Sequence, residues 1–268
     1  MPSYQGLIDL FYQYQSNIPI WGFAAALSFC LILILSLEKA KRKGVSGDDI
    51  FALVSITALG GLLGARIAYL LIYQTNVDFV STLSWGEVFY KGHLNIVGGY
   101  LGAVIAGWFY LQGFAALQRS KMTWLRFSDT FLYIVPLGLV FGYIGVFLVS
   151  ISKGAITNQG YPWVFPMNDS YIHPWGLYIA AGYLFLFMIL FILNQRLYEF
   201  RRPGYLTSVF VLGVSTIHFL ADFWQNTNLA YGDPRIIGLT ITQWVAIIVI
   251  FITGLTLLFR RARNREKV

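Results

Sequence analysis

Charged side chains are scarce in this sequence. Only 12% of the 268 residues are Asp, Glu, Lys or Arg, whereas 57% are hydrophobic. The mean hydropathy is +0.64. A soluble domain carries about 25% charged residues. The shortage excludes an ordinary soluble domain, and we expect an all-α polytopic membrane protein that forms a single integral membrane domain over residues 1–268.

Cysteine and histidine are also rare, which bears on metal and redox chemistry. Cys30 is the single cysteine, so no internal disulfide and no cysteine cluster can form. His93, His173 and His218 are the three histidines, and their spacing fits no zinc motif. We therefore expect neither a metal nor a cofactor.

Long apolar runs accompany the missing charge. A membrane-spanning helix needs about 20 mostly apolar residues, and seven segments qualify. The opening stretch MPSYQGLIDLFYQYQSN has neither a basic region nor a small-residue cleavage site, so we expect a true first span rather than a removable signal peptide. The seven expected transmembrane helices cover residues 18–37, 50–74, 93–112, 127–150, 174–194, 205–223 and 238–259.

The basic residues gather in alternate connections between these spans. Residues 38–49, 113–126, 195–204 and 260–268 hold all but four of the 19 Lys and Arg residues. By the positive-inside rule these segments are cytoplasmic, which places the N-terminus outside and the C-terminus in the cytoplasm. The net charge of +7 is therefore mainly a topology signal. Because it is dispersed rather than gathered in one patch, we expect no nucleic-acid partner.

The connections on the opposite side are long and aromatic. Residues 75–92 contain STLSWGEVFYKG, and residues 151–173 lead through NQGYPWVFPMNDSYIHPW into the next span. Tyr and Trp favour the headgroup level of a bilayer. We expect periplasm-side interfacial loops or short helices there, with residues 76–90 as a candidate for a short helix.

Glycines and polar residues meet in the third expected span, which contains GHLNIVGGYLG. Gly98 and Gly99 allow another helix to approach closely. His93 and Asn95 stand at the outer end of this span. They are either solvated or capping residues, or groups that face a ligand at the mouth of a cavity.

Arg66 lies within the second expected span. A charge there costs at least a few kcal/mol unless it meets a polar partner or cavity. The side chain either snorkels to the interface or offers its guanidinium to a lipid phosphate. The sequence leaves both interpretations open.

His218 and Asp222 lie four residues apart in the sixth expected span, which places them on one helical face within hydrogen-bonding reach. An aspartate that orients a histidine supports a general base. The alternative is a mutually satisfied polar pair near the outer end of the span. Asp129, at the start of the fourth span, is expected to be a first-turn carboxylate that complements the helix dipole.

Six segments, taken in order, carry a resemblance to a known family. They read KRKGVSGDDIFALVSITALGGLLGARIAYLLIY, GHLNIVGGYLGAVIAG, DTFLYIVPLGLVFGYIGVFLVS, YPWVFPMNDSYIHPWGLY, RRPGYLTSVFVLGVSTIHFLADFWQ and GLTITQWVAI. In order and spacing they resemble the bacterial prolipoprotein diacylglyceryl transferases. The likeness extends from about Trp21 to Arg260, which is nearly the whole chain.

The resemblance implies a transferase of the bacterial cytoplasmic (inner) membrane. Such an enzyme moves the diacylglyceryl group of phosphatidylglycerol onto the thiol of a lipobox cysteine at the outer membrane face, and glycerol phosphate leaves. The implied partners are a phospholipid, with phosphatidylglycerol first, and a lipobox prolipoprotein or another membrane protein. The reaction needs a cationic phosphate site, a way to activate the thiol, and side openings for lipid.

The chain departs from the family pattern at its polar positions. Val97 stands where the family has a histidine, and Tyr143 and His218 stand where it has arginines. The family's polar Asn-Gly-Glu segment is replaced by Val149, Ser150 and Ile151. The other departures, each replacing a polar family residue, are Val146, Ile179, Asp222 and Gln225.

The resemblance and the polar residues together give a set of candidate site residues. We expect catalytic roles for His218, Asp222 and His93. The residues expected to bind the lipid phosphate are Arg66, Tyr69, Tyr73, Asn95, Gly98, Gly99, Tyr143 and His173.

Two functions compete on this sequence. The first is a diacylglyceryl transferase, or a related lipid transferase, with a rewired active site. The second is a non-catalytic family member that serves as a lipid-binding or partner-holding membrane subunit. A transporter is disfavoured, because we find no inverted repeat and no helix broken at mid-membrane.

Overall fold

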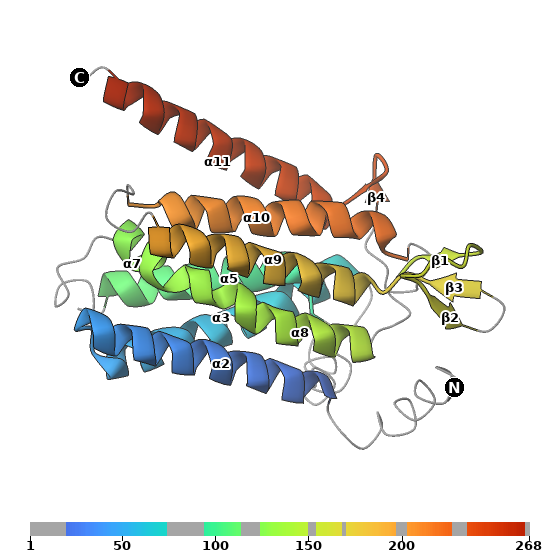
Figure 1. Cartoon of the computed structure of the whole chain (residues 1–268), viewed down its shortest axis with the longest axis horizontal. Helices are drawn as coiled ribbons and strands as arrows, with labels where there is room; N and C mark the ends of the chain where they lie inside the picture. The colour runs from blue at the N-terminus through green and yellow to red at the C-terminus, as the bar shows by residue number, and fades with distance from the viewer. Residues whose placement is uncertain are drawn as a thin grey trace.

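The structure is a computed structural model that describes residues 20–73, 94–113, 124–149, 154–167, 170–196, 203–226 and 235–265. Long helices lie along one direction, with two small sheets at one end (Figure 1). The helices are α2 (Ile20–Lys43), α3 (Gly47–Tyr73), α5 (Ile96–Gly113), α7 (Trp124–Phe131), α8 (Val135–Val149), α9 (Trp175–Arg196), α10 (Tyr205–Ala221) and α11 (Ile241–Arg265), with the 3₁₀ turns η1 (Leu132–Ile134) and η3 (Asp222–Trp224).

Within the described residues, each of the seven expected apolar segments is mostly helical. Among the described residues, six helical segments are long and apolar enough to cross a membrane, which confirms a mostly helical, multi-pass membrane protein. The apolar part of α5 covers Ile96–Gln112 and is shorter than the other spans. The seventh span therefore stays a prediction, as does the orientation of the termini.

The fourth expected span is interrupted near its start. It comprises α7, η1 and α8 rather than one regular helix. Pro136 is the second residue of α8 and is buried. Proline has no N–H to donate and clashes with the preceding turn, but it fits the first turn of a helix. The break directly before α8 follows from this residue.

The loop expected over residues 151–173 contains strands rather than short helices. Strands β1 (Ile156–Thr157), β2 (Phe165–Met167) and β3 (Ser170–Ile172) form an antiparallel sheet in the order β1-β3-β2. A second hairpin joins β4 (Arg235–Ile236) to β5 (Leu239–Thr240). Its turn residues Ile237 and Gly238 both have positive φ, as a type I′ turn requires. The helix suggested for residues 76–90 lies outside the described residues.

The two ends of the bundle differ in character (Figure 1). Both sheets lie at one end, whereas α2 and α11 end at the other. The last turn of α2 carries Lys41, Arg42 and Lys43. Gly44 then ends this helix in a left-handed conformation, with the Val45 N–H donating to the Ala40 carbonyl oxygen. This is the bond of a Schellman motif.

Helices α3 and α5 pack through glycine. A Cβ atom at Gly98 or Gly102 would collide with backbone atoms of Gly64 or Gly60. Small residues that let two backbones approach are a common basis of helix association in membranes. The close-packing role expected for the glycines of the third span is confirmed at Gly98.

The helices close into a ring. Each helix contacts the next in the order α2, α8, α9, α10, α11, α5, α3, and α3 contacts α2 again. The contact between α5 and α11 is the sparsest in this circuit, and α11 runs at an angle to α10 (Figure 1). The main core cluster lies among α8, α9 and α10 and includes Tyr143, Ile179 and Tyr183.

Asp129 stabilises a helix other than its own. Its carboxylate accepts hydrogen bonds from the backbone N–H groups of Gly204 and Thr207, both at 2.8 Å, and from the Thr207 hydroxyl at 2.8 Å. These donors lie at the start of α10. A carboxylate at a helix N-terminus is favoured by the unpaired N–H groups and by the dipole. Asp129 therefore complements the dipole of α10 rather than that of α7, the helix to which it belongs.

Candidate functional site

A groove of about 250 Å³ lies between α5, α10 and α11. Its walls are mainly aliphatic. The polar groups among its described lining residues are Tyr100, Ser215, His218 and Thr242. Leu101 and Val104 line it and are largely exposed, so within a membrane the groove faces lipid. A groove of this composition suits an acyl chain with a polar group at one point of its wall.

His218 is the centre of a hydrogen-bonded cluster of tyrosines. Its Nε2 atom lies 2.8 Å from the Tyr183 hydroxyl and 3.4 Å from the hydroxyls of Tyr100 and Tyr143. The hydroxyls of Tyr100 and Tyr183 are also hydrogen-bonded to each other. Three different helices, α5, α8 and α9, therefore present hydroxyl groups to one imidazole on α10.

The other ring nitrogen of His218 has no such support. Its Nδ1 atom is buried and has no hydrogen-bond partner among the described residues. The side chain as a whole is 3% exposed and lines the groove. A buried polar atom without a partner costs free energy, and a substrate group entering the groove would remove that cost.

The Asp222 carboxylate does not hydrogen-bond to the His218 imidazole, contrary to the expectation from their spacing. The Thr240 hydroxyl donates to the Asp222 carboxylate at 2.8 Å, and Arg235 donates to the Asp222 carbonyl oxygen at 3.3 Å. Regular α-helix ends at Ala221, and Asp222 opens a 3₁₀ turn. The Asp222 N–H still donates to the His218 carbonyl oxygen, so the helical spacing is kept and the carboxylate is bonded to Thr240 instead.

Asp222 belongs instead to a polar cluster at the start of α11. The Thr240 N–H donates to the Gln243 side chain at 2.9 Å, and the Gln243 amide donates to the Phe219 carbonyl oxygen at 3.0 Å. Gln243 and Asp222 are almost completely buried. These bonds join the end of α10 to the beginning of α11.

Arg66 is buried in α3, 3% exposed. Its guanidinium carbon lies 5.7 Å from the centre of the Tyr69 ring, within the range of a cation–π interaction. A side chain that had snorkelled into headgroup water would be exposed, so the burial favours the polar-partner interpretation. Tyr73, the third polar residue expected on this face, is the last residue of α3.

Asn95 has a structural role at the start of α5. The Gly98 N–H donates to Asn95 Oδ1 at 3.2 Å, which is the N-cap bond that asparagine commonly supplies. The Asn95 N–H donates to the Ala65 carbonyl oxygen at 3.0 Å. Of the two interpretations left open for this residue, the structure therefore favours the cap. His93 lies outside the described residues.

The remaining expected residues fall into two places. Tyr143 is in the histidine cluster, as described. His173 lies at the sheet end, where its Nδ1 is 3.0 Å from the Tyr178 hydroxyl. Burial lowers the pKa of His173 below its usual value of 6.5, so the imidazole is neutral at pH 7.

Tyr100 and Tyr183 are the residues that the sequence did not single out. Tyr100 directly follows the Gly98–Gly99 pair, and Tyr183 follows the small residues Ala180, Ala181 and Gly182 in mid-span. A buried tyrosine usually finds a hydrogen-bond partner. Tyrosines beside small residues inside a span were thus the available signal.

Known proteins resemble this chain over most of its length. A family model described as prolipoprotein diacylglyceryl transferase matches residues 9–260. A phosphatidylglycerol–prolipoprotein diacylglyceryl transferase of Azoarcus sp. (strain BH72) is 29% identical over 254 residues, covering 92% of each chain. The protein of that name from Acinetobacter baumannii (strain ACICU) is 30% identical over 220 residues, which is 79% of this chain and 77% of the relative. A third, from Erythrobacter litoralis (strain HTCC2594), is 30% identical over 210 residues, which is 76% of this chain and 70% of the relative. This chain belongs to the prolipoprotein diacylglyceryl transferase family, a family of transferases.

Proposed function

We propose that this protein is a diacylglyceryl transferase with a rebuilt active site. In this proposal it takes the diacylglyceryl group of phosphatidylglycerol and passes it to the lipobox cysteine thiol of a prolipoprotein. One observation carries the proposal. Val97 and His218 line the same groove, and Tyr143 contacts His218, so three positions that differ from the family pattern meet at one site.

The reaction has a role for the imidazole. His218 takes the proton of the thiol, the sulfur bonds to the terminal glyceryl carbon, and the carbon–oxygen bond to phosphate breaks. Glycerol phosphate leaves with the electron pair. Nδ1 of His218 is the buried nitrogen without a partner among the described residues, so in this proposal it accepts the thiol proton once the bound substrates reach it, while the hydroxyls orient Nε2. A base held by hydrogen bonds within reach of a thiol is the usual arrangement for activating this nucleophile.

The phosphate needs donors in the transition state. The hydroxyls of Tyr100, Tyr143 and Tyr183 gather around Nε2 of His218, and they supply donors where the family pattern has an arginine. Preorganised donors of this kind are worth a few kcal/mol each at a developing charge. We further propose Arg66, beside Tyr69, as the cation on the α3 side, and His93, four residues before Val97 in the sequence, as a second polar group.

A second candidate function rests on a different observation. No Lys or Arg is among the described residues that line the groove, and Ile179, at a position where the family pattern has a glutamate, is fully buried in the core. An apolar groove without a cation suits a non-catalytic member. Such a protein would hold a phospholipid, or a partner helix, without transferring anything.

The environment of the site is part of the proposal. We propose a single domain over residues 1–268 in the bacterial inner membrane, with seven spans, the N-terminus outside and the C-terminus in the cytoplasm. The sheet end of the bundle would then face the periplasm, where a lipobox cysteine arrives. His218 lies in the last turn of α10, toward this end.

The test is a thiol-lipidation assay with purified protein, phosphatidylglycerol liposomes and a lipobox peptide. We expect His218→Ala to lower the transfer rate by about 100-fold or more, because general-base catalysis contributes about 10²–10⁴-fold. Thr216→Ala is the matched control, since Thr216 is exposed on the same helix and its hydroxyl bonds only to Leu212 within α10. Wild-type protein that transfers nothing, yet retains phosphatidylglycerol after purification, would favour the second candidate.

A further inference from the structure

A second pocket lies at the opposite end of the bundle from the sheets. It has a volume of about 210 Å³ and lies between the last turns of α2, the start of the fourth span and the last turns of α9. It shares no lining residue with the groove between α5, α10 and α11. Any ligand of this pocket is therefore separate from the proposed transfer site.

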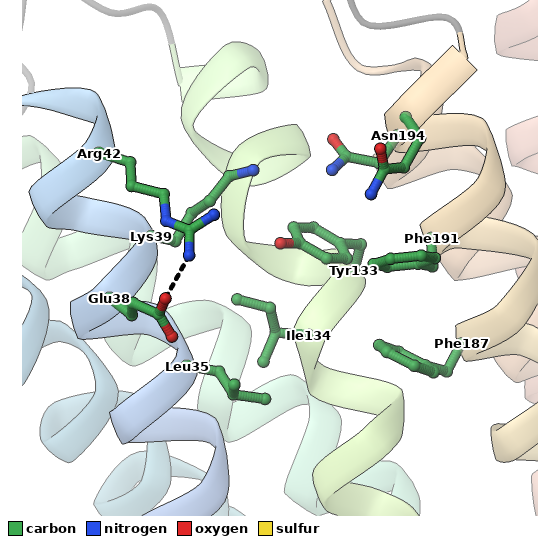
Figure 2. Close-up of a pocket in the computed structure, with 10 residues that line it drawn as sticks. Leu35, Glu38, Lys39, Arg42, Tyr133, Ile134, Phe187, Phe191 and Asn194 are labelled. Atoms are coloured by element: carbon green, nitrogen blue, oxygen red, sulfur yellow. Dashed lines mark hydrogen bonds and ion pairs between the residues drawn. The ribbon is translucent and has the colours of Figure 1, made fainter.

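Two cations stand on one wall of this pocket. Lys39 and Arg42 project from α2, as Figure 2 shows. The Lys39 ammonium lies 5.3 Å from the centre of the Tyr133 ring. Arg42 forms an ion pair with Glu38, but both side chains of this pair are largely exposed, at 72% and 56%. An exposed pair is worth little, so an anion can compete with Glu38 for the guanidinium.

The other walls change from polar to apolar. Asn194 on α9 faces the pocket near the level of the cations, whereas Phe187, Ile134 and Leu35 lie further from the helix ends (Figure 2). Leu35 precedes the end of α2 by two helical turns, about 12 Å at 1.5 Å per residue. This order, cation first and hydrocarbon behind it, matches the order of groups in a phospholipid that enters from the interface.

We propose that this pocket binds an anionic glycerophospholipid. Lys39 and Arg42 hold the phosphodiester, the Asn194 amide donates to the headgroup or ester oxygens, and an acyl chain descends past Leu35, Ile134 and Phe187. The positive-inside rule predicts that this end of the protein lies in the cytoplasmic leaflet, whose anionic lipids attract basic residues. The proposal does not depend on transferase activity.

The charge of α2 alone would not identify this site. Basic residues in the last turn of a helix complement its dipole wherever they point, and Lys41 and Lys43 do so without lining the pocket. Lys39 and Arg42 differ because they line a cavity that also has an amide and an apolar floor. The two pairs of cations therefore provide a matched comparison on one helix.

The experiment uses full-length protein in phosphatidylcholine nanodiscs that contain a trace of photoreactive phosphatidylglycerol. The diazirine sits near the ester end of one acyl chain, and labelled peptides are mapped by mass spectrometry. We expect adducts on residues 31–38 and 184–194. Lys39→Gln combined with Arg42→Gln should lower these adducts by at least about five-fold, because the charge-assisted contacts to the phosphodiester are lost.

Two internal comparisons make the result specific. Lys41→Gln combined with Lys43→Gln should leave the labelling of both sites within about two-fold of wild type, and adducts on the groove segments 97–104 and 210–218 should survive both double substitutions. Excess unlabelled phosphatidylglycerol should compete at residues 31–38, and free glycerol phosphate should not. Retained labelling at the groove also shows that the variants are folded.

Three results would overturn the proposal. Labelling of residues 31–38 by photoreactive phosphatidylcholine as strongly as by phosphatidylglycerol would indicate ordinary annular lipid. An equal loss of labelling in the two double variants would indicate a general surface potential. Competition by free glycerol phosphate would indicate a site for a soluble anion rather than a lipid.

Discussion

At the scale of single residues, His218 is the group whose surroundings differ most from what its neighbours in sequence suggest. A histidine four residues before an aspartate in a helix is expected to bond to it. Here the carboxylate is taken by Thr240, and hydroxyl groups from three other helices surround the imidazole. Tertiary packing has replaced a local pair with a cluster that no sequence spacing encodes.

The tyrosine cluster should contribute to stability. Tyr183→Phe removes the hydroxyl that lies 2.8 Å from His218 Nε2 and leaves the buried imidazole with only the longer contacts. We expect a loss of about 1–3 kcal/mol in the free energy of unfolding, because a buried polar atom loses its partner. Thermal or denaturant unfolding in detergent measures it. Tyr205→Phe is the control, since Tyr205 is 38% exposed, and equal losses in the two variants would contradict the cluster's role.

Val97 allows the rebuilt-site proposal to be tested by addition rather than removal. Val97→His places an imidazole in the groove that His218 lines, at the position where the family pattern has one. If the phosphate donors are in place, we expect the thiol-lipidation rate to rise by at least about ten-fold. A well-positioned acid or base contributes about 100-fold or more, and a newly introduced imidazole should reach part of that.

The control for that experiment is Val104→His. Val104 lies two turns along the same helix and also lines the groove, so it receives a similar imidazole away from the tyrosine cluster. A rise in both variants would reflect the added base alone. A Val97→His variant that stayed inert would mean that the remaining phosphate site has also been lost.

At the scale of helices and strands, the hydrophobic pattern predicted every long apolar element, because a span must be apolar along its whole length. It did not predict the break at Pro136, since the segment stays apolar through η1. It also missed the strands between residues 156 and 172. These strands are two or three residues long and depend on pairing with each other rather than on a repeating pattern.

The candidate site was predicted only in part for the same reason. Spacing identified His218 and the glycines, because each stands out as polar or small within an apolar run, whereas Tyr143 was identified through the family resemblance. Tyr100 and Tyr183 join them through contacts between positions 83 residues apart. Such contacts depend on which helices become neighbours in the ring, and that arrangement is not readable from one helix at a time.

The α3–α5 contact should be among the least tolerant parts of the chain. Gly102→Val places a side chain against backbone atoms of Gly60 and Gly64, which cannot move aside as a flexible side chain would. We expect a loss of about 3 kcal/mol, at the upper end of overpacking effects, or failure to accumulate folded protein. Size-exclusion chromatography and unfolding in detergent measure both outcomes.

Gly254→Val on α11 is the matched control, because an added Cβ there meets no atom within 4 Å. Valine forms helix slightly better than glycine, so this variant should be as stable as the wild type or slightly more stable. Equal destabilisation by the two substitutions would show that the glycines matter for reasons other than the close approach of α3 and α5.

At the scale of the whole molecule, the basic segments and the two sheets mark opposite ends. The C-terminal ends of α2 and α11 lie at the same end of the bundle, away from β1–β3 and β4–β5 (Figure 1). With Cys30 replaced by Ala, Gln159→Cys should react with a membrane-impermeant maleimide in intact spheroplasts. Ser46→Cys should react only after permeabilisation, because the positive-inside rule places it in the cytoplasm.

Both reporter positions are exposed, so accessibility depends on the side of the membrane and not on burial. Labelling of Ser46→Cys in intact spheroplasts, with Gln159→Cys protected, would show that the topology is the reverse of the predicted one. It would also move the proposed lipid pocket at Lys39 and Arg42 to the outer leaflet.

The sparse contact between α5 and α11 lies beside the groove that both helices line, and we expect a ligand to enter there. A molecule that enters between these helices arrives by diffusion in the plane of the bilayer, so its effective concentration is its mole fraction among the surrounding lipids. A lipid that makes up a tenth or more of the membrane can then keep the groove filled with only a modest preference over its neighbours. Selection among lipids at such an entrance depends on relative abundance as much as on affinity, and a change in membrane composition would alter occupancy without any change in the protein.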